Sequence, residues 1–393
     1  MDRDDSLPVG VDGRDLDGLV GEVARHTISR RQFLERGLAL GLSASAIGAV
    51  LSACGTGAVD EGATPAAMET TTPDTMYLFN WADYMPKSIL KSFQQKTGIK
   101  VEESYFEDNE SLLAKLKSGA RGYDMTVAAD YMVTTMIKSG LLLPLEMKYI
   151  PNFKNVEERY YKPEYDNEED GHKYSVPYQW GTTGVGVRTD VVTEPVSAWT
   201  DLWDSKYKGQ IVMLNDERDV LGAALKMMGY SMNTKDQGEL DQAVEKCIEQ
   251  KPLVKAYTSI ATRRSVVEGT GMTQGWTGYI LSAYDIVGED KLRYMLPSEG
   301  YDLWTDNAVV PVGAKSPYAT HLLMDYICDP QIAGELVDYT WFHSPVPAAK
   351  DYSDPIVWKF APTGSDLDRA EALIDLGEFT RNYTDAWRKV KEA

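Results

Sequence analysis

Short apolar segments alternate with amphipathic segments from residue 76 onward. The apolar segments have the length and residue types of β-strands, and the amphipathic segments place their apolar side chains on one helical face. In the first part of this region, strands are predicted over residues 76–81, 99–105 and 124–128, and helices over 86–97, 111–118 and 131–139. This β-α-β-α-β order predicts a mostly parallel sheet that is covered on both faces.

The second part of the chain continues the alternation. Residues 174–187 are rich in Gly and β-forming residues and are expected to carry the chain out of a first lobe. Further strands are predicted over residues 211–214, 273–276 and 304–311, and helices over 220–228, 240–250, 318–328 and the C-terminus. No internal repeat is visible. The region from residue 76 onward is therefore assigned to the α/β class.

The first 53 residues follow a different pattern. Arg30 and Arg31 form a twin-arginine motif, and residues 37–50 are apolar but too short and weakly hydrophobic for a permanent membrane span. Residues 51–54 have the form of a lipoprotein cleavage box that offers Cys54 for acylation. We therefore expect a twin-arginine signal peptide over 1–53 and a Thr/Pro-rich tether over 54–75. The alternative is an ordinary signal peptide in which Cys54 is coincidental.

These signals predict an extracytoplasmic protein. It is expected in the periplasm or on the outer face of the cytoplasmic membrane, anchored there by lipid on Cys54 after twin-arginine export. The formal net charge of −20 argues against a nucleic-acid partner and is compatible with a cationic ligand. Solubility or adaptation to high salt would also explain it.

Cysteine and histidine are scarce, with 3 Cys and 4 His in 393 residues. Cys247 and Cys328 lie in segments predicted to be helical, and they either pair or remain as two buried free thiols. The His residues are scattered and no metal-ligand spacing occurs, so no metal site is expected. No cofactor-binding or catalytic motif was found, which favours a protein that is not an enzyme.

Aromatic and acidic residues recur together just beyond the predicted strand ends. In open α/β sheets, ligands bind beyond the carboxyl ends of strands. Ring faces attract cations by about 0.5–2 kcal/mol, and a buried ammonium also needs a carboxylate because its desolvation is costly. The pairing therefore indicates a site for an organic ammonium. The residues are Trp81, Asp83, Tyr84, Asp130, Tyr131, Asp216, Asp219, Trp276, Trp304 and Asp306.

Each of these residues also has a structural interpretation. Asp130 stands directly before a predicted helix and could be its N-cap. Asp216 and Asp219 resemble a capping box in which Asp219 reaches back. Trp81, Trp276 and Trp304 could be core residues, and Tyr84 a surface ring. The number of acid–aromatic pairs at strand ends shifts the interpretation toward a binding site.

The segment Tyr77-Leu78-Phe79-Asn80-Trp81-Ala82-Asp83-Tyr84 resembles the opening of the spermidine/putrescine-binding proteins of ABC importers. The resemblance continues in order over most of residues 76–350 and includes residues 178–184, 199–203, 229–231 and 297–300. Its most specific parts are residues 80–84, the Asp216/Asp219 pair and the Trp304/Asp306 pair. The motif at residues 199–203 is common to many extracellular solute-binding proteins.

This resemblance implies a two-lobed periplasmic-binding-protein-like fold of type II, with a hinge and a ligand cleft between the lobes. The implied lobes are residues 76–182 plus 305–350 and residues 183–304 plus 351–393. Trp81, Tyr84, Tyr131, Trp276 and Trp304 match ring positions. Asp216, Asp219 and Asp306 match carboxylates that hold amines, and Asp83 matches an acidic position beside the first tryptophan.

Four positions depart from the family pattern. Ala129 replaces a serine, and Asp130 adds a carboxylate where a neutral residue is common. Phe342 replaces a tyrosine of the cleft, and Asp219 is one methylene shorter than the usual glutamate. These changes preserve the amine class of ligand but leave open which polyamine is bound.

The resemblance implies a monomeric receptor that captures spermidine or putrescine and delivers it to the permease subunits of an ABC importer, without a cofactor. A first alternative is a receptor for another organic cation or for ferric ion, although Trp81 and Trp304 suit a metal poorly. A second is a secreted α/β enzyme. A structural or adhesive surface protein is a third.

Overall fold

The computed structural model describes residues 68–166 and 171–393. The predicted signal peptide and residues 54–67 of the predicted tether, which include Cys54, lie outside these residues, so their assignments stay predictions. Residues 69–393 form one compact unit. Within the described ranges, no helix combines the length and apolar character needed to cross a membrane.

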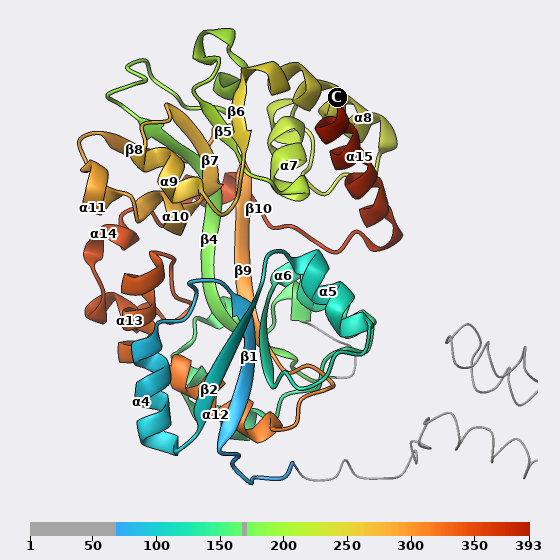
Figure 1. Cartoon of the computed structure of the whole chain (residues 1–393), viewed down its shortest axis with the longest axis vertical. Helices are drawn as coiled ribbons and strands as arrows, with labels where there is room; N and C mark the ends of the chain where they lie inside the picture. Colours follow the sequence, from blue (N-terminus) through green and yellow to red (C-terminus); the bar gives the residue numbers. More distant parts are fainter. Residues whose placement is uncertain (1–67, 167–170) are drawn as a thin grey trace, which may run out of the picture. The chain divides into compact units, whose positions relative to one another are not determined.

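The strands form one mixed sheet with the order β2-β1-β3-β9-β4-β7-β5-β6, to which β10 adds through β9 and β8 through β4. The strands are β1 (Thr75–Trp81), β2 (Lys100–Phe106), β3 (Met125–Ala129), β4 (Ser175–Arg188), β5 (Ile211–Met213), β6 (Val254–Tyr257), β7 (Met272–Trp276), β8 (Leu292–Met295), β9 (Tyr301–Val309) and β10 (Ala370–Glu371). In Figure 1, β4 and β9 run side by side, with β1 and β2 towards the lower end and β5, β6 and β7 towards the upper end.

The sheet is less parallel than the sequence predicted. The expected parallel pairing holds for β1 with β2 and β3, and for β5 with β6 and β7. The pairs β3–β9, β9–β4 and β4–β7 are antiparallel. The β-α-β rhythm predicted only the local units correctly, because β4 and β9 pair across long sequence separations that no local pattern reveals.

The α-helices are α4 (Lys87–Thr97), α5 (Asn109–Lys117), α6 (Asp130–Lys138), α7 (Glu217–Met227), α8 (Gln237–Gln250), α9 (Thr262–Val267), α10 (Thr277–Leu281), α11 (Tyr284–Val287), α12 (Pro317–Ile327), α13 (Pro330–Thr340), α14 (Pro355–Trp358) and α15 (Thr380–Glu392). Their ends follow ordinary capping chemistry. Gly98 ends α4 in the left-handed conformation, with φ of 80°. The carboxylates of Asp108, Asp236 and Asp329 accept backbone N–H groups at the starts of α5, α8 and α13.

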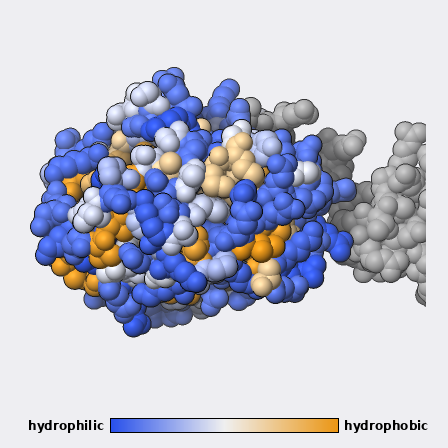
Figure 2. All heavy atoms as spheres, turned by 90° about the horizontal axis from the view of Figure 1, so that it is seen from above, coloured by the Kyte–Doolittle hydropathy of each residue, from blue (hydrophilic) through white to orange (hydrophobic). Residues whose placement is uncertain are grey.

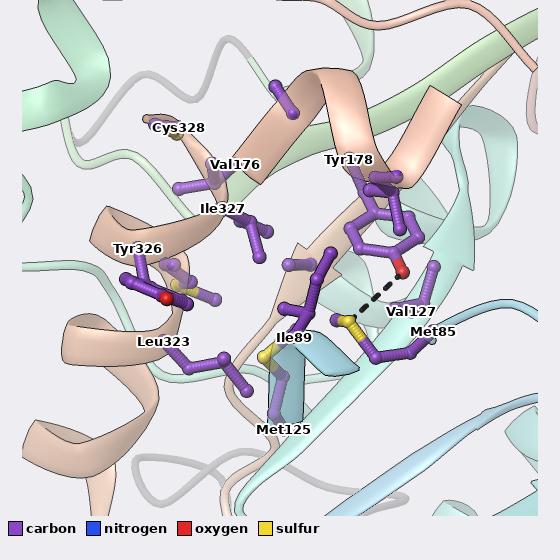
Figure 3. Packing of buried hydrophobic residues seen from close by; sticks show 14 of the residues in the cluster. Met85, Ile89, Met125, Val127, Val176, Tyr178, Leu323, Tyr326, Ile327 and Cys328 are labelled. Atoms are coloured by element: carbon purple, nitrogen blue, oxygen red, sulfur yellow. Dashed lines mark hydrogen bonds between the residues drawn. The ribbon is translucent and has the colours of Figure 1, made fainter. Parts of the chain in front are cut away.

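The two largest hydrophobic cores lie at the two ends of the β4–β9 pair. One contains Met76, Ile89 and Leu323, and Figure 3 shows part of it, where Tyr178 Oη donates to Met85 Sδ over 3.8 Å. The other contains side chains of α7, α8 and α15. The chain is therefore organised as two lobes, each on its own core. The predicted residue ranges of the lobes are not tested by this arrangement and stay a prediction.

The alternation of side chains along β1 and β3 explains how both faces of the first lobe's sheet are covered. Met76, Leu78 and Val127 face the core that contains Ile89 of α4. Phe79 and Ala128, one residue further along their strands, face a separate cluster with Leu112 of α5. The predicted covering of both faces is confirmed for these strands.

The protein surface seen in Figure 2 is mostly hydrophilic, and its hydrophobic atoms occur in separate groups. This agrees with the 25% of charged residues in the sequence. Cys247 and Cys328 are both buried and free, so the predicted alternative of two free thiols is the one that the structure shows.

Candidate functional site

A cavity with about 630 Å³ of empty space, part of which is open to solvent, lies where β3, β7 and β9 meet the starts of α6 and α7. The lining residues are Trp81, Tyr84, Asn109, Ala129, Asp130, Tyr131, Asp216, Asp219, Trp276, Tyr279, Asp302, Trp304, Asp306, Phe342 and Leu373.

The cavity lining brings together ten of the eleven predicted ligand-binding residues. They are Trp81, Tyr84, Asp130, Tyr131, Asp216, Asp219, Trp276, Trp304, Asp306 and Phe342. The eleventh, Asp83, is exposed in the turn after β1, where its φ is 55°, and it does not line the cavity. Side-chain direction at a turn depends on backbone angles that the sequence motif did not reveal. That these residues bind a ligand stays a prediction.

The charged residues that line the cavity are all acidic. Among the described residues that line the cavity, five are aspartates and none is Lys, Arg or His. Asp130, Asp219, Asp302 and Asp306 are between 2% and 8% exposed. Because a buried carboxylate without a cation is costly, this arrangement favours a ligand that brings positive charge.

Asp306 and Asp130 are held by hydrogen bonds from different elements. Tyr84 Oη donates to Asp306 Oδ2 over 2.6 Å. Asp130 Oδ1 accepts from its neighbour Tyr131 N over 2.8 Å, and its Oδ2 accepts from Thr305 N over 3.2 Å. Asp130 is thus the first residue of α6, and its N-cap is Ala129. The alternative interpretation of Asp130 as the helix cap is therefore wrong.

Asp216 and Asp219 have separate roles at the start of α7. Asp216 Oδ1 accepts from the backbone N–H groups of Arg218 and Asp219, so the N-cap interpretation of Asp216 is confirmed. Asp219 does not complete a capping box, because its Oδ2 accepts from Trp276 Nε1 over 2.9 Å. Asp219 Oδ1 has no hydrogen-bond partner within the described ranges. This buried oxygen is available to a ligand.

Burial changes the proton affinity of these carboxylates. It raises the pKa of Asp130, Asp219 and Asp306 to about 7, and the Asp216 charge adds to the shift at Asp219. The pKa of Asp216 is also raised by burial, and that of Asp302 is raised well above its usual range. Near neutral pH, part of these carboxylates is therefore protonated when no cation is bound.

Phe342 lies at the centre of an aromatic cluster. Its ring centroid is 5.0 Å from that of Trp304, 5.5 Å from that of Tyr279 and 5.7 Å from that of Tyr84, each in an edge-to-face arrangement. The rings come from β9, α10, the turn after β1 and the segment after α13, and together they form an apolar wall beside the aspartates.

Sequence reasoning missed three polar or aromatic lining residues and one buried cation beside them. The lining residues are Asn109, Asp302 and Tyr279. The cation is Arg218, which is 3% exposed and whose Nη2 donates to Asn233 Oδ1 over 2.8 Å. Its guanidinium lies 4.8 Å from the ring of Tyr383. A lone arginine within the acidic run 216–219 was the available signal.

Asp302 was missed because the predicted strand began at residue 304. β9 in fact begins at Tyr301, which places Asp302 on the same strand face as Trp304 and Asp306. The two-residue alternation would have identified Asp302 if the start of the strand had been predicted correctly.

No group of three or more His, Cys, Asp or Glu side chains that could hold a metal ion occurs in the described part of the chain. The cavity lining presents carboxylates and aromatic rings. Together they can stabilise an elongated cation by charge pairing and by contact with ring faces.

The chain is similar to known proteins in sequence and in structure. The family model described as bacterial extracellular solute-binding protein matches residues 88–363. A spermidine/putrescine-binding periplasmic protein of Salmonella typhimurium is 31% identical over 324 residues, which are 81% of this chain and 92% of that protein. Two solved structures are each 27% identical, covering 81% of this chain and 99% of the other. They are the Tp0655 (TpPotD) lipoprotein of Treponema pallidum, with a TM-score of 0.72, and a spermidine/putrescine ABC transporter substrate-binding protein from Streptococcus pneumoniae, with 0.70.

Proposed function

We propose that this chain, which belongs to the bacterial extracellular solute-binding protein family, binds polyamines in the aspartate-lined cavity and delivers them to the permease of an ABC importer. The predicted resemblance and the predicted two-lobed type II fold are confirmed by these relatives. The ligand, the delivery step and the roles of single residues are our proposal.

One observation carries the proposal. Five aspartates and seven aromatic residues line one cavity, and none of the described lining residues is basic. A polyamine matches this arrangement because it carries separate ammonium groups for the carboxylates and methylenes for the ring faces. The relatives whose names include spermidine and putrescine support the same class of ligand.

We further propose that Cys54 carries the lipid anchor after twin-arginine export, with residues 54–75 as the tether. The name of the Treponema pallidum relative, a lipoprotein, supports this proposal. The receptor would then act as a monomer outside the cytoplasmic membrane, close to its permease. Incorporation of labelled fatty acid into the full chain, and its loss in a Cys54→Ser variant, would test the anchor.

A thermal-shift panel tests the proposed ligand class. Putrescine, cadaverine, spermidine and spermine are expected to raise the melting temperature, because a ligand at one hundred times its Kd adds about 2.7 kcal/mol to the free energy of unfolding. Magnesium ion, glutamate and a sugar serve as controls, since a protein with a net charge of −20 responds to any cation to some extent. Stabilisation by a neutral or anionic solute, without any by polyamines, would contradict the proposal.

Gly181 tests the position of the Trp304 ring. The two residues are paired across β4 and β9, and a Cβ at Gly181 would lie 2.6 Å from Trp304 Cζ2. Gly181→Ala is therefore expected to displace the ring and weaken polyamine binding about three- to thirty-fold, the effect of losing one cation–ring contact. Tryptophan fluorescence and calorimetry would measure the two effects. Unchanged affinity would show that the Trp304 ring does not contact the ligand.

A further inference from the structure

Asp302 has a buried carboxylate oxygen that the fold leaves without a hydrogen-bond partner. It is 2% exposed and lines the cavity, and its Oδ1 has no partner within the described ranges. The neighbouring Asp219 presents a second oxygen, Oδ1, in the same state. Native proteins rarely bury such oxygens without a partner, so two of them on residues that line one cavity indicate a place where a ligand can donate hydrogen bonds.

The position of Asp302 on β9 gives it a defined distance from Asp306. Both residues and Trp304 between them line the cavity, whereas Leu303 and Thr305 do not, as expected for alternate positions of one strand. Four residues of strand span about 13 Å. Trp304 therefore stands midway between two carboxylates on one face of the strand.

The sheet fixes this spacing. Asp306 pairs with Ala129 of β3 and with Gln179 of β4, and Asp302 pairs with Glu371 of β10. Strand pairing at both positions limits how far the backbone that carries each carboxylate can move. A ligand must therefore fit the spacing, because the strand cannot adjust to the ligand.

The spacing discriminates between polyamines of different length. An extended chain advances about 1.25 Å per bond, so the outer nitrogens of spermidine are about 11 Å apart and those of putrescine about 6 Å apart. Each ammonium lies about 2.8 Å from its carboxylate oxygen, which allows the nitrogens to sit somewhat inward of the carboxylates. The two outer ammonium groups of a linear triamine can reach Asp302 and Asp306 at the same time, and those of a short diamine cannot.

We propose that Asp302, together with Asp219, binds one outer ammonium group and Asp306 binds the other, so that β9 selects a linear triamine over a short diamine. The ring of Trp304 contacts the methylene chain of the ligand between the two carboxylates. This inference rests on the proposed function. It adds a ligand-binding residue, Asp302, and assigns the choice of ligand length to the spacing of two residues on one strand.

The first test is a length series on the unaltered protein by titration calorimetry. The probes are diaminobutane, diaminopentane, diaminooctane and spermidine. The affinity is expected to rise at least tenfold from diaminobutane to diaminooctane, which has the same span as spermidine. Equal affinities along the series would overturn the inference while leaving the proposed function intact. Failure of every probe to bind would overturn the proposed function itself.

The second test is Asp302→Asn, which keeps the shape of the side chain and removes its charge. It is expected to weaken spermidine binding at least tenfold and to change diaminobutane binding less than threefold, which reduces the length dependence because only Asp219 then remains to bind that ammonium group. Asp285→Asn is the matched control, because Asp285 is exposed on α11, does not line the cavity and gives the same change in net charge.

A melting curve without ligand separates the binding role from a structural one. Removing an unpaired buried carboxylate is expected to leave the melting temperature of Asp302→Asn unchanged or higher. If Asp302 instead supports the buried Arg218, the melting temperature falls and the ratio of spermidine to diaminobutane affinity stays that of the unaltered protein. That result would overturn the inference.

Discussion

Replacing Asp306 with Asn is expected to weaken polyamine binding well over tenfold, to about one hundredfold. The variant keeps the shape of the side chain, and Tyr84 Oη can still donate to its amide oxygen in place of Asp306 Oδ2. The ammonium group would lose its buried counter-charge, which typically costs 2–5 kcal/mol, and about 2.7 kcal/mol corresponds to one hundredfold. Titration calorimetry with putrescine and spermidine would measure the loss.

Two comparisons make this result specific to Asp306. Asp285→Asn carries the same change in net charge at an exposed position outside the cavity and is expected to bind within twofold of the unaltered protein. Asp306→Asn is expected to weaken both ligands, whereas Asp302→Asn weakens mainly the longer one. If the Asp306→Asn variant binds both polyamines as tightly as the Asp285→Asn control, Asp306 has a structural role.

Polyamine affinity is expected to fall at least one hundredfold between pH 8 and pH 5. Asp130, Asp219 and Asp306, whose pKa values burial raises to about 7, must be ionised to pair with ammonium groups. At pH 5, which is two units below a pKa of about 7, only about one in a hundred copies of each carboxyl group is ionised. The need to deprotonate one such group therefore lowers the affinity about one hundredfold. Amines with a pKa near that of lysine, about 10.4, stay protonated throughout. The pH dependence therefore arises from the protein.

Calorimetry in two buffers with different ionisation enthalpies would measure the protons released on binding. More than one proton per polyamine is expected between pH 6 and pH 7, because Asp130, Asp219 and Asp306 all line the cavity and have pKa values of about 7. Affinity that stays constant from pH 5 to pH 8 would show that the carboxylates do not pair with the ligand.

Without ligand, the same groups make the free energy of unfolding depend on pH in the opposite direction from the polyamine affinity. Their pKa values are about 7 in the folded state and about 4 in the unfolded chain, so the folded state binds more protons between these values. Their contribution to the free energy of unfolding therefore decreases as the pH rises from about 4 to about 7 and then levels off. Saturating polyamine should remove this decrease, because the ligand supplies the missing positive charge.

Much of the candidate site was predictable because strand ends and acid–aromatic pairs are local features of the sequence. Trp81, Tyr131 and Asp306 were found from their positions beyond or within predicted strands, and all three line the cavity. Asp83 has the same sequence context but lies in an exposed turn. Local patterns assign residues to a strand end, but the backbone angles of the turn decide which side chain enters the cavity.

Arg218 and Asp302 show where sequence reasoning failed. Arg218 was not among the predicted site residues, yet it is buried and its guanidinium packs against Tyr383, 165 residues further along the chain. Asp302 fell outside a strand whose start was predicted three residues late. In both cases the decisive contact or register depends on residues far apart in the sequence.

The sequence by itself determined the α/β class, the family resemblance, the ligand class that we propose and most of the cavity residues. Periodicity, capping residues and motifs involve residues that are close together in the sequence, so they can be recognised without the structure. Only the tertiary structure decided the antiparallel pairing of β4 with β9, the separate roles of Asp216 and Asp219, and the unpaired state of Asp302. These features depend on which distant strands and helices share a boundary, and burial at that boundary sets the charge state of each carboxylate.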